Sequence, residues 1–163
     1  MGKFMMRELF LTLFYSGKSP IAPGTIGSIV ALVIGLPLVY FSAESIFLLG
    51  ILIGIIAVKQ IDVYEKSGGI HDDKSIVIDE LVGIWLAMGM VGFSLAGLIG
   101  AFLFFRLYDV VKPSIIGRVD RDIKGGFGVV GDDVLAGIIA GLSTLVCLKV
   151  MDYFQIDKNL YLF

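Results

Sequence analysis

The sequence predicts an all-α membrane protein: a polytopic helical bundle with about four to five membrane segments and a short N-terminal helix at the membrane surface. Three observations predict it. The mean hydropathy is +0.93. Of the 163 residues, 57% are hydrophobic and only 17% charged, whereas soluble domains have roughly 45–50% apolar residues. The charges are gathered into a few segments between long uncharged runs. The length suits one domain, residues 1–163.

Four uncharged runs are the candidate membrane segments. They are 19–43, 45–58, 81–105 and 134–148. Because a bilayer core takes about 20 helical residues, the first and third runs are long enough and the other two fall a little short. The N-terminal segment differs, since Arg7 and Glu8 interrupt its apolar residues. We expect an amphipathic helix on the membrane surface there, and no cleavable signal.

The run 81–105 leaves two topologies open. As one helix it would be about 37 Å long, which a tilted helix can fit into a core of about 30 Å. As a hairpin turning near 89–94, it would return the chain to its starting side. The flanking segments 59–80 and 106–133 both carry several Lys and Arg residues, and such loops lie in the cytoplasm. We favour the hairpin, because it puts both segments on one face.

Carboxylates stand at the ends of the apolar runs. Asp79 and Glu80 open the third run, and Asp109 follows its end. Asp132 and Asp133 open the fourth. A single acidic pair is most often a helix cap, but ionised groups at membrane depth are costly and usually face a cavity, a partner or an ion. The repetition therefore predicts converging oxygen donors, a set that suits Mg²⁺ and leaves waters for a phosphate to replace.

Basic residues accompany these carboxylates. Lys112 lies three residues after Asp109, and Arg121 and Lys124 precede a glycine turn. Arg and Lys side chains beside free backbone N–H groups bind phosphate. Positive charge at lipid headgroups explains any single one of them about equally well.

The hydroxyls of Thr25 and Ser28 lie just after Pro23, at the predicted start of a helix. Such hydroxyls most often cap the helix. The sharper alternative is that they contact a phosphate at the helix N-terminus.

Several absences narrow the chemistry. A net charge of −2 gives no reason to expect a nucleic-acid partner. The one cysteine, Cys147, lies in an apolar run, which disfavours a disulfide framework, a cysteine zinc site and cysteine phosphatase chemistry. The one histidine, His71, cannot serve a mechanism that needs two. If phosphoryl transfer occurs, metal and carboxylates must carry it.

Three motifs together resemble a known family. They are SPIAPGTIGS (19–28), HDDKSIVIDELVGIW (71–85) and FRLYDVVKPSIIGRVDRDIKGGFGVVGDDVLAG (105–137). In their content, order and spacing the sequence resembles the phosphatidylglycerophosphatase A family of bacterial membrane lipid phosphatases. The resemblance covers nearly the whole chain, and the last motif is long and specific.

The resemblance implies Mg²⁺-dependent hydrolysis of the phosphomonoester of phosphatidylglycerophosphate, a bilayer phospholipid, to phosphatidylglycerol and phosphate. It also implies a multi-pass inner-membrane protein whose active site faces the cytoplasm; the oligomeric state stays open. The family's acidic positions fall on Asp79, Glu80, Asp109, Asp132 and Asp133. Its basic positions fall on Lys112, on Arg121 and on Lys124, where the family also has other basic residues.

The residue roles are our own hypothesis. Lys112 and Arg121 would bind the phosphate oxygens and stabilise transition-state charge. The nucleophile is either water or a carboxylate, and we favour water because the chain has no recognised phospho-aspartate motif. One or two Mg²⁺ ions would be held by Asp79, Glu80, Asp132 and Asp133.

Two other functions compete. A cation channel or transporter would use intramembrane acids as a pathway, but these acids sit at segment ends beside basic residues. A lipid transferase of the CDP-alcohol type also uses clustered aspartates and Mg²⁺. It needs a D-G-x-x-A-R run, which this sequence does not contain.

Overall fold

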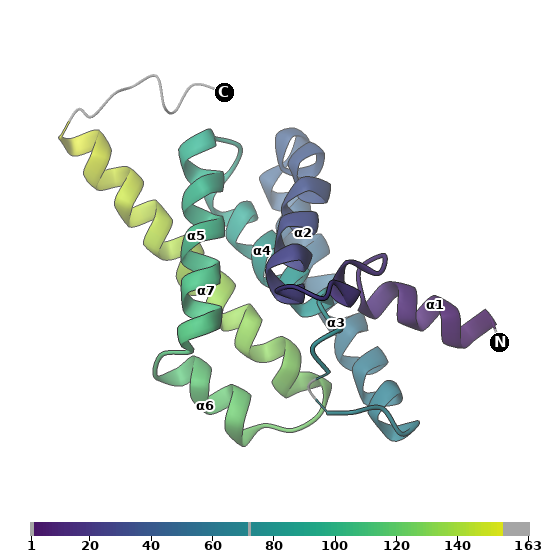
Figure 1. Cartoon of the computed structure of the whole chain (residues 1–163). Coiled ribbons are helices and arrows are strands. Elements are labelled where there is room, and N and C mark those ends of the chain that lie inside the picture. The colour runs from purple at the N-terminus through teal and green to yellow at the C-terminus, as the bar shows by residue number, and fades with distance from the viewer. Residues whose placement is uncertain (1, 72, 155–163) are drawn as a thin grey trace.

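The structure, a computed structural model, describes residues 2–71 and 73–154. Within these residues the chain forms seven α-helices and one short 3-10 helix, and no strand (Figure 1). The predicted all-α fold is therefore confirmed.

In the part of the chain that the structure describes, three helices are long and apolar enough to cross a membrane: α2 (Pro23–Phe41), α3 (Ala43–Lys66) and α7 (Gly126–Tyr153). The last two contain the apolar runs that looked short, because each helix continues into a neighbouring polar segment. Pro23 begins α2, where its fixed φ angle suits a first helical residue. Ser42 caps α3 by accepting the Ser45 N–H at 3.0 Å.

The run 81–105 is interrupted and forms the predicted hairpin. Helix α4 (Ile78–Val91) ends at Gly92, whose φ of 71° favours glycine. Helix α5 (Leu95–Val111) starts three residues after Gly92, with the Ser94 hydroxyl accepting the Gly97 N–H at 3.1 Å. The described residues thus form three candidate spans and one hairpin of shorter helices. The start of α4 and the end of α5 consequently lie close together.

Helix α4 is the centre of the bundle, with α2, α3, α5 and α7 packed around it. Ten of its 14 residues are buried. The indole N–H of Trp85 donates to the Ala31 carbonyl of α2 at 2.9 Å. Helix α7 crosses α4 closely, since a Cβ placed on Gly137 would lie 2.2 Å from the Gly83 carbonyl oxygen. Small residues permit such close backbone approach between membrane helices.

Two short helices complete the fold. Helix α1 (Gly2–Leu11) projects from the side of the bundle and exposes Phe4, Met5 and Met6. Helix α6 (Ile115–Asp122) packs against α7. In Figure 1, α6, the start of α7 and the loop before α4 lie towards the same end of the bundle. The polar segments thus share one end.

Candidate active site

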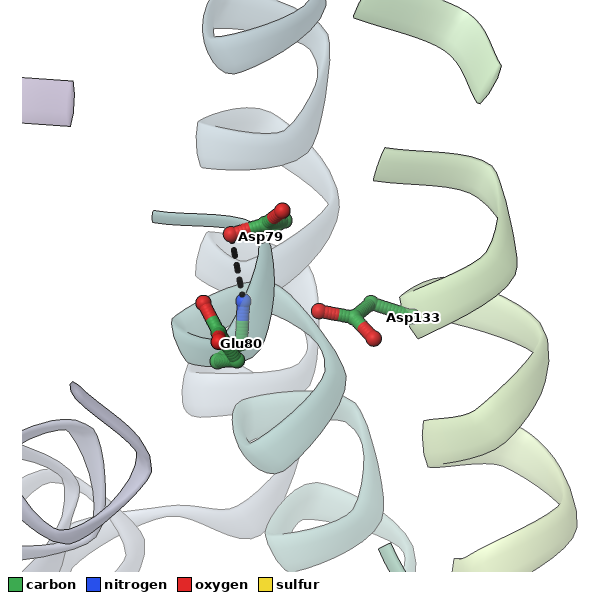
Figure 2. Close-up of side chains that lie close together, drawn as sticks. All are labelled: Asp79, Glu80 and Asp133. Carbon is green, nitrogen blue, oxygen red and sulfur yellow. Dashed lines mark hydrogen bonds between the residues drawn. The ribbon is translucent and has the colours of Figure 1, made fainter. Parts of the chain in front are cut away.

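Three carboxylates from two helices meet at this end of the bundle. Asp79 and Glu80 come from the first turn of α4, and Asp133 lies two turns into α7 (Figure 2). One carboxylate oxygen from each lies within 4.8 Å of the others. Asp79 and Asp133 are only 9% and 3% exposed.

This cluster fits a divalent cation. Like charges repel strongly away from water, so three buried carboxylates need a compensating charge. The buried Glu80 Oε2 atom has no hydrogen-bond partner among the described residues, and neither has the buried Asp132 Oδ1 atom. Buried polar atoms are normally satisfied. Hard oxygen donors of this kind are the ligands that Mg²⁺ and Ca²⁺ prefer.

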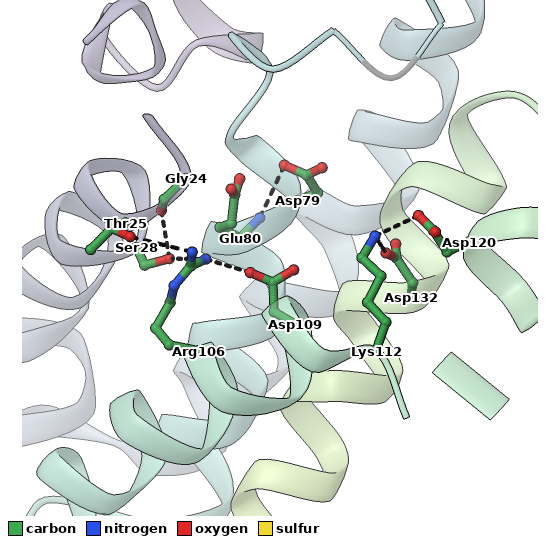
Figure 3. A network of polar contacts seen from close by, with 10 residues as sticks. All are labelled: Gly24, Thr25, Ser28, Asp79, Glu80, Arg106, Asp109, Lys112, Asp120 and Asp132. Atoms are coloured by element: carbon green, nitrogen blue, oxygen red, sulfur yellow. Dashed lines mark hydrogen bonds and ion pairs between the residues drawn. The ribbon is translucent and has the colours of Figure 1, made fainter. Parts of the chain in front are cut away.

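Asp132 lies in the same region but turns towards a lysine. The Lys112 ammonium group donates to Asp132 Oδ2 at 2.6 Å and also to Asp120 of α6 (Figure 3). Burial alone would lower the pKa of Lys112, but these two hydrogen bonds outweigh it and raise the pKa above its usual range. Lys112 therefore carries a fixed positive charge beside the acid cluster.

A second cation lies on the other side of the cluster. Arg106 of α5 donates to Asp109 Oδ2 and, at 3.3 Å each, to the hydroxyls of Ser28 and Thr25 in α2 (Figure 3). Ser28 is fully buried and donates in turn to the Gly24 carbonyl at 2.8 Å. The two hydroxyls thus join α2 to α5.

A cavity of about 390 Å³ lies among the carboxylates and Lys112. Its size falls within the range of small-molecule sites, roughly 300–1,000 Å³. It is also bordered by Lys74, which the sequence analysis did not select. The predicted site residues that line it are Asp79, Glu80, Asp109, Lys112, Lys124, Asp132 and Asp133.

The structure places three predicted phosphate contacts elsewhere. Neither Thr25 nor Ser28 is among the described residues that line the cavity, because Arg106 occupies both hydroxyls. Arg121 is also outside it, with a side chain 72% exposed and bonded to Asp122 at 3.2 Å. Consecutive helical residues point about 100° apart, so α6 directs Asp120 towards Lys112 and Arg121 outwards.

Besides Lys74, sequence reasoning missed two polar groups that bind predicted site residues, Arg106 and Asp120. The signal for Arg106 was present, since it stands three residues before Asp109 and residues at that spacing share a helix face. No local pattern reveals Asp120, whose pairing with Lys112 depends on how α6 folds back.

The fold and site define a class: a helical membrane protein whose acidic cavity, flanked by cations, suits a divalent ion and a phosphorylated group. Comparison of the sequence with known protein families also points to an enzyme that acts on phosphorylated groups. The sequence model of the family described as Phosphatidylglycerophosphatase A matches residues 9–148. The chain therefore belongs to the phosphatidylglycerophosphatase A family, a family of phosphatases.

Individual relatives support this. The chain is 38% identical to phosphatidylglycerophosphatase A of Escherichia coli K12 over 133 residues, covering 78% of this chain and 74% of that protein. It is 36% identical to the Haemophilus influenzae protein of the same name, covering 78% and 79%. A Bacteroides thetaiotaomicron protein, provisionally named a phosphatidylinositol-3-phosphatase, is 35% identical, covering 82% and 91%. No solved structure matches the chain.

Proposed function

We propose that this protein is a Mg²⁺-dependent lipid phosphatase that hydrolyses phosphatidylglycerophosphate to phosphatidylglycerol and phosphate in glycerophospholipid synthesis. The observation that carries the proposal is the convergence of Asp79, Glu80 and Asp133 within 4.8 Å. Lys112 supplies a positive charge on the same cavity. Family membership supports the choice of a phosphatase.

The same arrangement supports a cytoplasmic location for the site. Polar segments 59–80 and 106–133 both carry Lys and Arg residues, and the α4–α5 hairpin returns the chain so that both meet at one end. By the positive-inside rule this end faces the cytoplasm of the inner membrane. The acyl chains stay in the bilayer and only the headgroup enters the cavity.

The residues of the chain divide the work as follows. Asp79, Glu80 and Asp133 would hold the metal, with Asp132 beside them. Lys112 binds non-bridging phosphate oxygens and stabilises the charge that grows on them in the transition state. Lys124, at the cavity wall, adds a second cation for the headgroup. Positioning and charge stabilisation are most of what phosphoryl transfer requires.

The reaction is a simple hydrolysis. A water oxygen forms a bond to phosphorus, the bond from phosphorus to the glycerol oxygen breaks, and that oxygen takes a proton. A Mg²⁺ ion held by these carboxylates would supply Lewis-acid chemistry, neutralising phosphate oxygens and lowering the pKa of a bound water. We favour water as the nucleophile, so radiolabelled substrate should leave no trapped phosphoenzyme.

The deciding experiment measures phosphate release by the purified protein in detergent. Phosphatidylglycerophosphate and phosphatidylinositol-3-phosphate are compared as substrates, because the Bacteroides relative's name points to the second. Each is assayed with Mg²⁺ and with EDTA. We expect Mg²⁺-dependent release from phosphatidylglycerophosphate.

Each other outcome contradicts part of the proposal. Faster release from the inositol lipid would reject the proposed substrate. Equal release in EDTA would reject the metal. No release from either lipid would reject the phosphatase activity itself.

A further inference from the structure

The Arg106 side chain donates hydrogen bonds to three residues at the edge of the proposed site. We propose that it is a positioning residue, which fixes the Asp109 carboxylate and the start of α2 against the carboxylate cluster of Asp79, Glu80 and Asp133. This inference rests on the proposed function, because it explains how that site is kept in shape.

The first contact concerns Asp109. Arg106 and Asp109 are three residues apart on α5 and form an ion pair, with side chains 18% and 16% exposed. Asp109 lines the same cavity as Asp79 and Asp133. Without a cation beside it, repulsion from those buried carboxylates would turn Asp109 away. The pair uses one Asp109 oxygen and leaves the other outside this contact.

The second set of contacts concerns α2. Arg106 donates to Thr25 and Ser28, in the first turns of that helix. The same turns form part of the cavity wall through Pro23 and Gly24. A Cβ on Gly24 would lie 2.5 Å from Glu80 Oε1. The start of α2 therefore packs directly on the Glu80 carboxylate of the cluster, and Arg106 holds the helix start there.

The geometry distinguishes this role from phosphate binding. Both terminal nitrogens of Arg106 already donate to protein oxygens: one to Asp109 and Ser28, the other to Thr25. Arg106 is also absent from the described lining of the cavity. Its effect on the reaction must therefore pass through Asp109 and α2.

The test compares Arg106→Gln and Arg106→Lys with the wild type in detergent. The measurements are kcat and KM for phosphatidylglycerophosphate, the unfolding temperature, and Mn²⁺ affinity by electron paramagnetic resonance. For Arg106→Gln we expect kcat to fall about 10–100-fold and Mn²⁺ to bind several-fold more weakly, as when residues supporting metal ligands are replaced. KM should change less than roughly twofold. Arg106→Lys, which keeps the charge, should recover part of both losses.

A double variant tests the route through Asp109. If Arg106 acts mainly through that carboxylate, Arg106→Gln combined with Asp109→Asn should be little slower than Asp109→Asn alone. The matched control is Arg118→Gln on the exposed face of α6, which should keep wild-type values.

Three results would overturn the proposal. A lower unfolding temperature with unchanged kcat and Mn²⁺ affinity would make Arg106 merely structural. A rise in KM alone would make it a phosphate ligand. Fully additive losses in the double variant would separate it from Asp109. If the wild type released no phosphate, the proposed function would fail, whereas the Mn²⁺ comparison would still decide the role of Arg106.

Discussion

The two acidic pairs look alike in the sequence but differ in the fold. Both members of the α4 pair, Asp79 and Glu80, join the carboxylate cluster. The α7 pair is divided: Asp133 faces α4, and Asp132 faces Lys112. Neighbouring helical side chains diverge by about 100°, so division is the ordinary result. The α4 pair converges because Glu80 is long and Gly24 leaves room for it.

Because the α7 pair is divided, its two carboxylates have different roles. Asp133 belongs to the carboxylate cluster proposed to bind the cation, whereas Asp132 holds Lys112, the lysine that we propose binds phosphate. In the proposed site, one helix would thus set the distance between the metal and the charge that binds phosphate. Both carboxylates of the α4 pair, in contrast, belong to the cluster.

The chain segments before the two pairs are held in the same way. The Tyr64 hydroxyl of α3 donates to Asp73, ahead of α4, at 2.6 Å. Asp62 of α3 accepts the Gly126 N–H, at the start of α7, at 2.7 Å. The last turns of α3 therefore set where both pairs begin. The following predictions test this comparison.

The largest effect is expected from loss of a cluster carboxylate. Asp79→Asn and Asp133→Asn should each lower kcat by more than about 100-fold, since residues that merely support metal ligands already contribute 10–100-fold. Phosphate release in detergent measures this. Asp152→Asn, exposed near the end of α7, is the control and should be fully active. Near-normal activity of both cluster variants would refute the metal assignment.

The second-largest effect is expected from a bulky side chain placed where α4 and α7 cross. Gly137→Leu places a side chain where a Cβ already lies 2.2 Å from the Gly83 carbonyl oxygen, so α4 and α7 must separate. We expect a stability loss of at least about 1–3 kcal/mol, with reduced kcat because Asp79 and Asp133 move apart. Unfolding in detergent and turnover report the two effects. Cys147→Leu, at an exposed position of α7, should change neither; if Gly137→Leu were equally silent, the close crossing would be wrong.

A smaller effect should follow from Asp132→Asn. Lys112 keeps its contact with Asp120 but loses the charge of Asp132. We expect a roughly tenfold fall in kcat/KM, in the range of a supporting residue, and much less change in Mn²⁺ affinity than Asp133→Asn causes. Equal Mn²⁺ losses in the two variants would show that the α7 pair is not divided.

The smallest effect is expected from loss of the hydrogen bond between Tyr64 of α3 and Asp73, which lies ahead of α4. Burial alone would raise the pKa of Asp73, but hydrogen bonds from Tyr64 and Ser75 lower it below its usual value of 3.8. A lowered pKa stabilises the fold above that value, and the contribution disappears as the pH falls through the lowered pKa. Tyr64→Phe should therefore cost less than about 1 kcal/mol at neutral pH, since solvent screens this partly exposed group.

Unfolding in detergent at neutral pH and at acid pH measures this last effect. The difference between Tyr64→Phe and the wild type should shrink in acid. A difference that stayed constant with pH would mean that the hydroxyl acts without the Asp73 charge.

Sequence patterns predicted the apolar helices and the acidic residues of the site, but not helix α6, Arg106 or Asp120. Uncharged runs predicted the helices because lipid requires apolar side chains, and the basic segments on both sides of 81–105 predicted the hairpin. The five acids predicted for the site all line one cavity: Asp79, Glu80, Asp109, Asp132 and Asp133. Arg121 and Thr25 do not, because a local pattern does not show which way a helix face turns or which partner occupies a hydroxyl.

The sequence by itself thus determined that apolar helices would bring their acidic ends together, since hydropathy and charge position act along the chain. Only the tertiary structure decided which carboxylates lie together in the cluster and which bind Lys112 or Arg106. That choice depends on the rotation and closeness of α4, α5 and α7, which are set by packing between residues far apart in the sequence, such as Gly83 and Gly137.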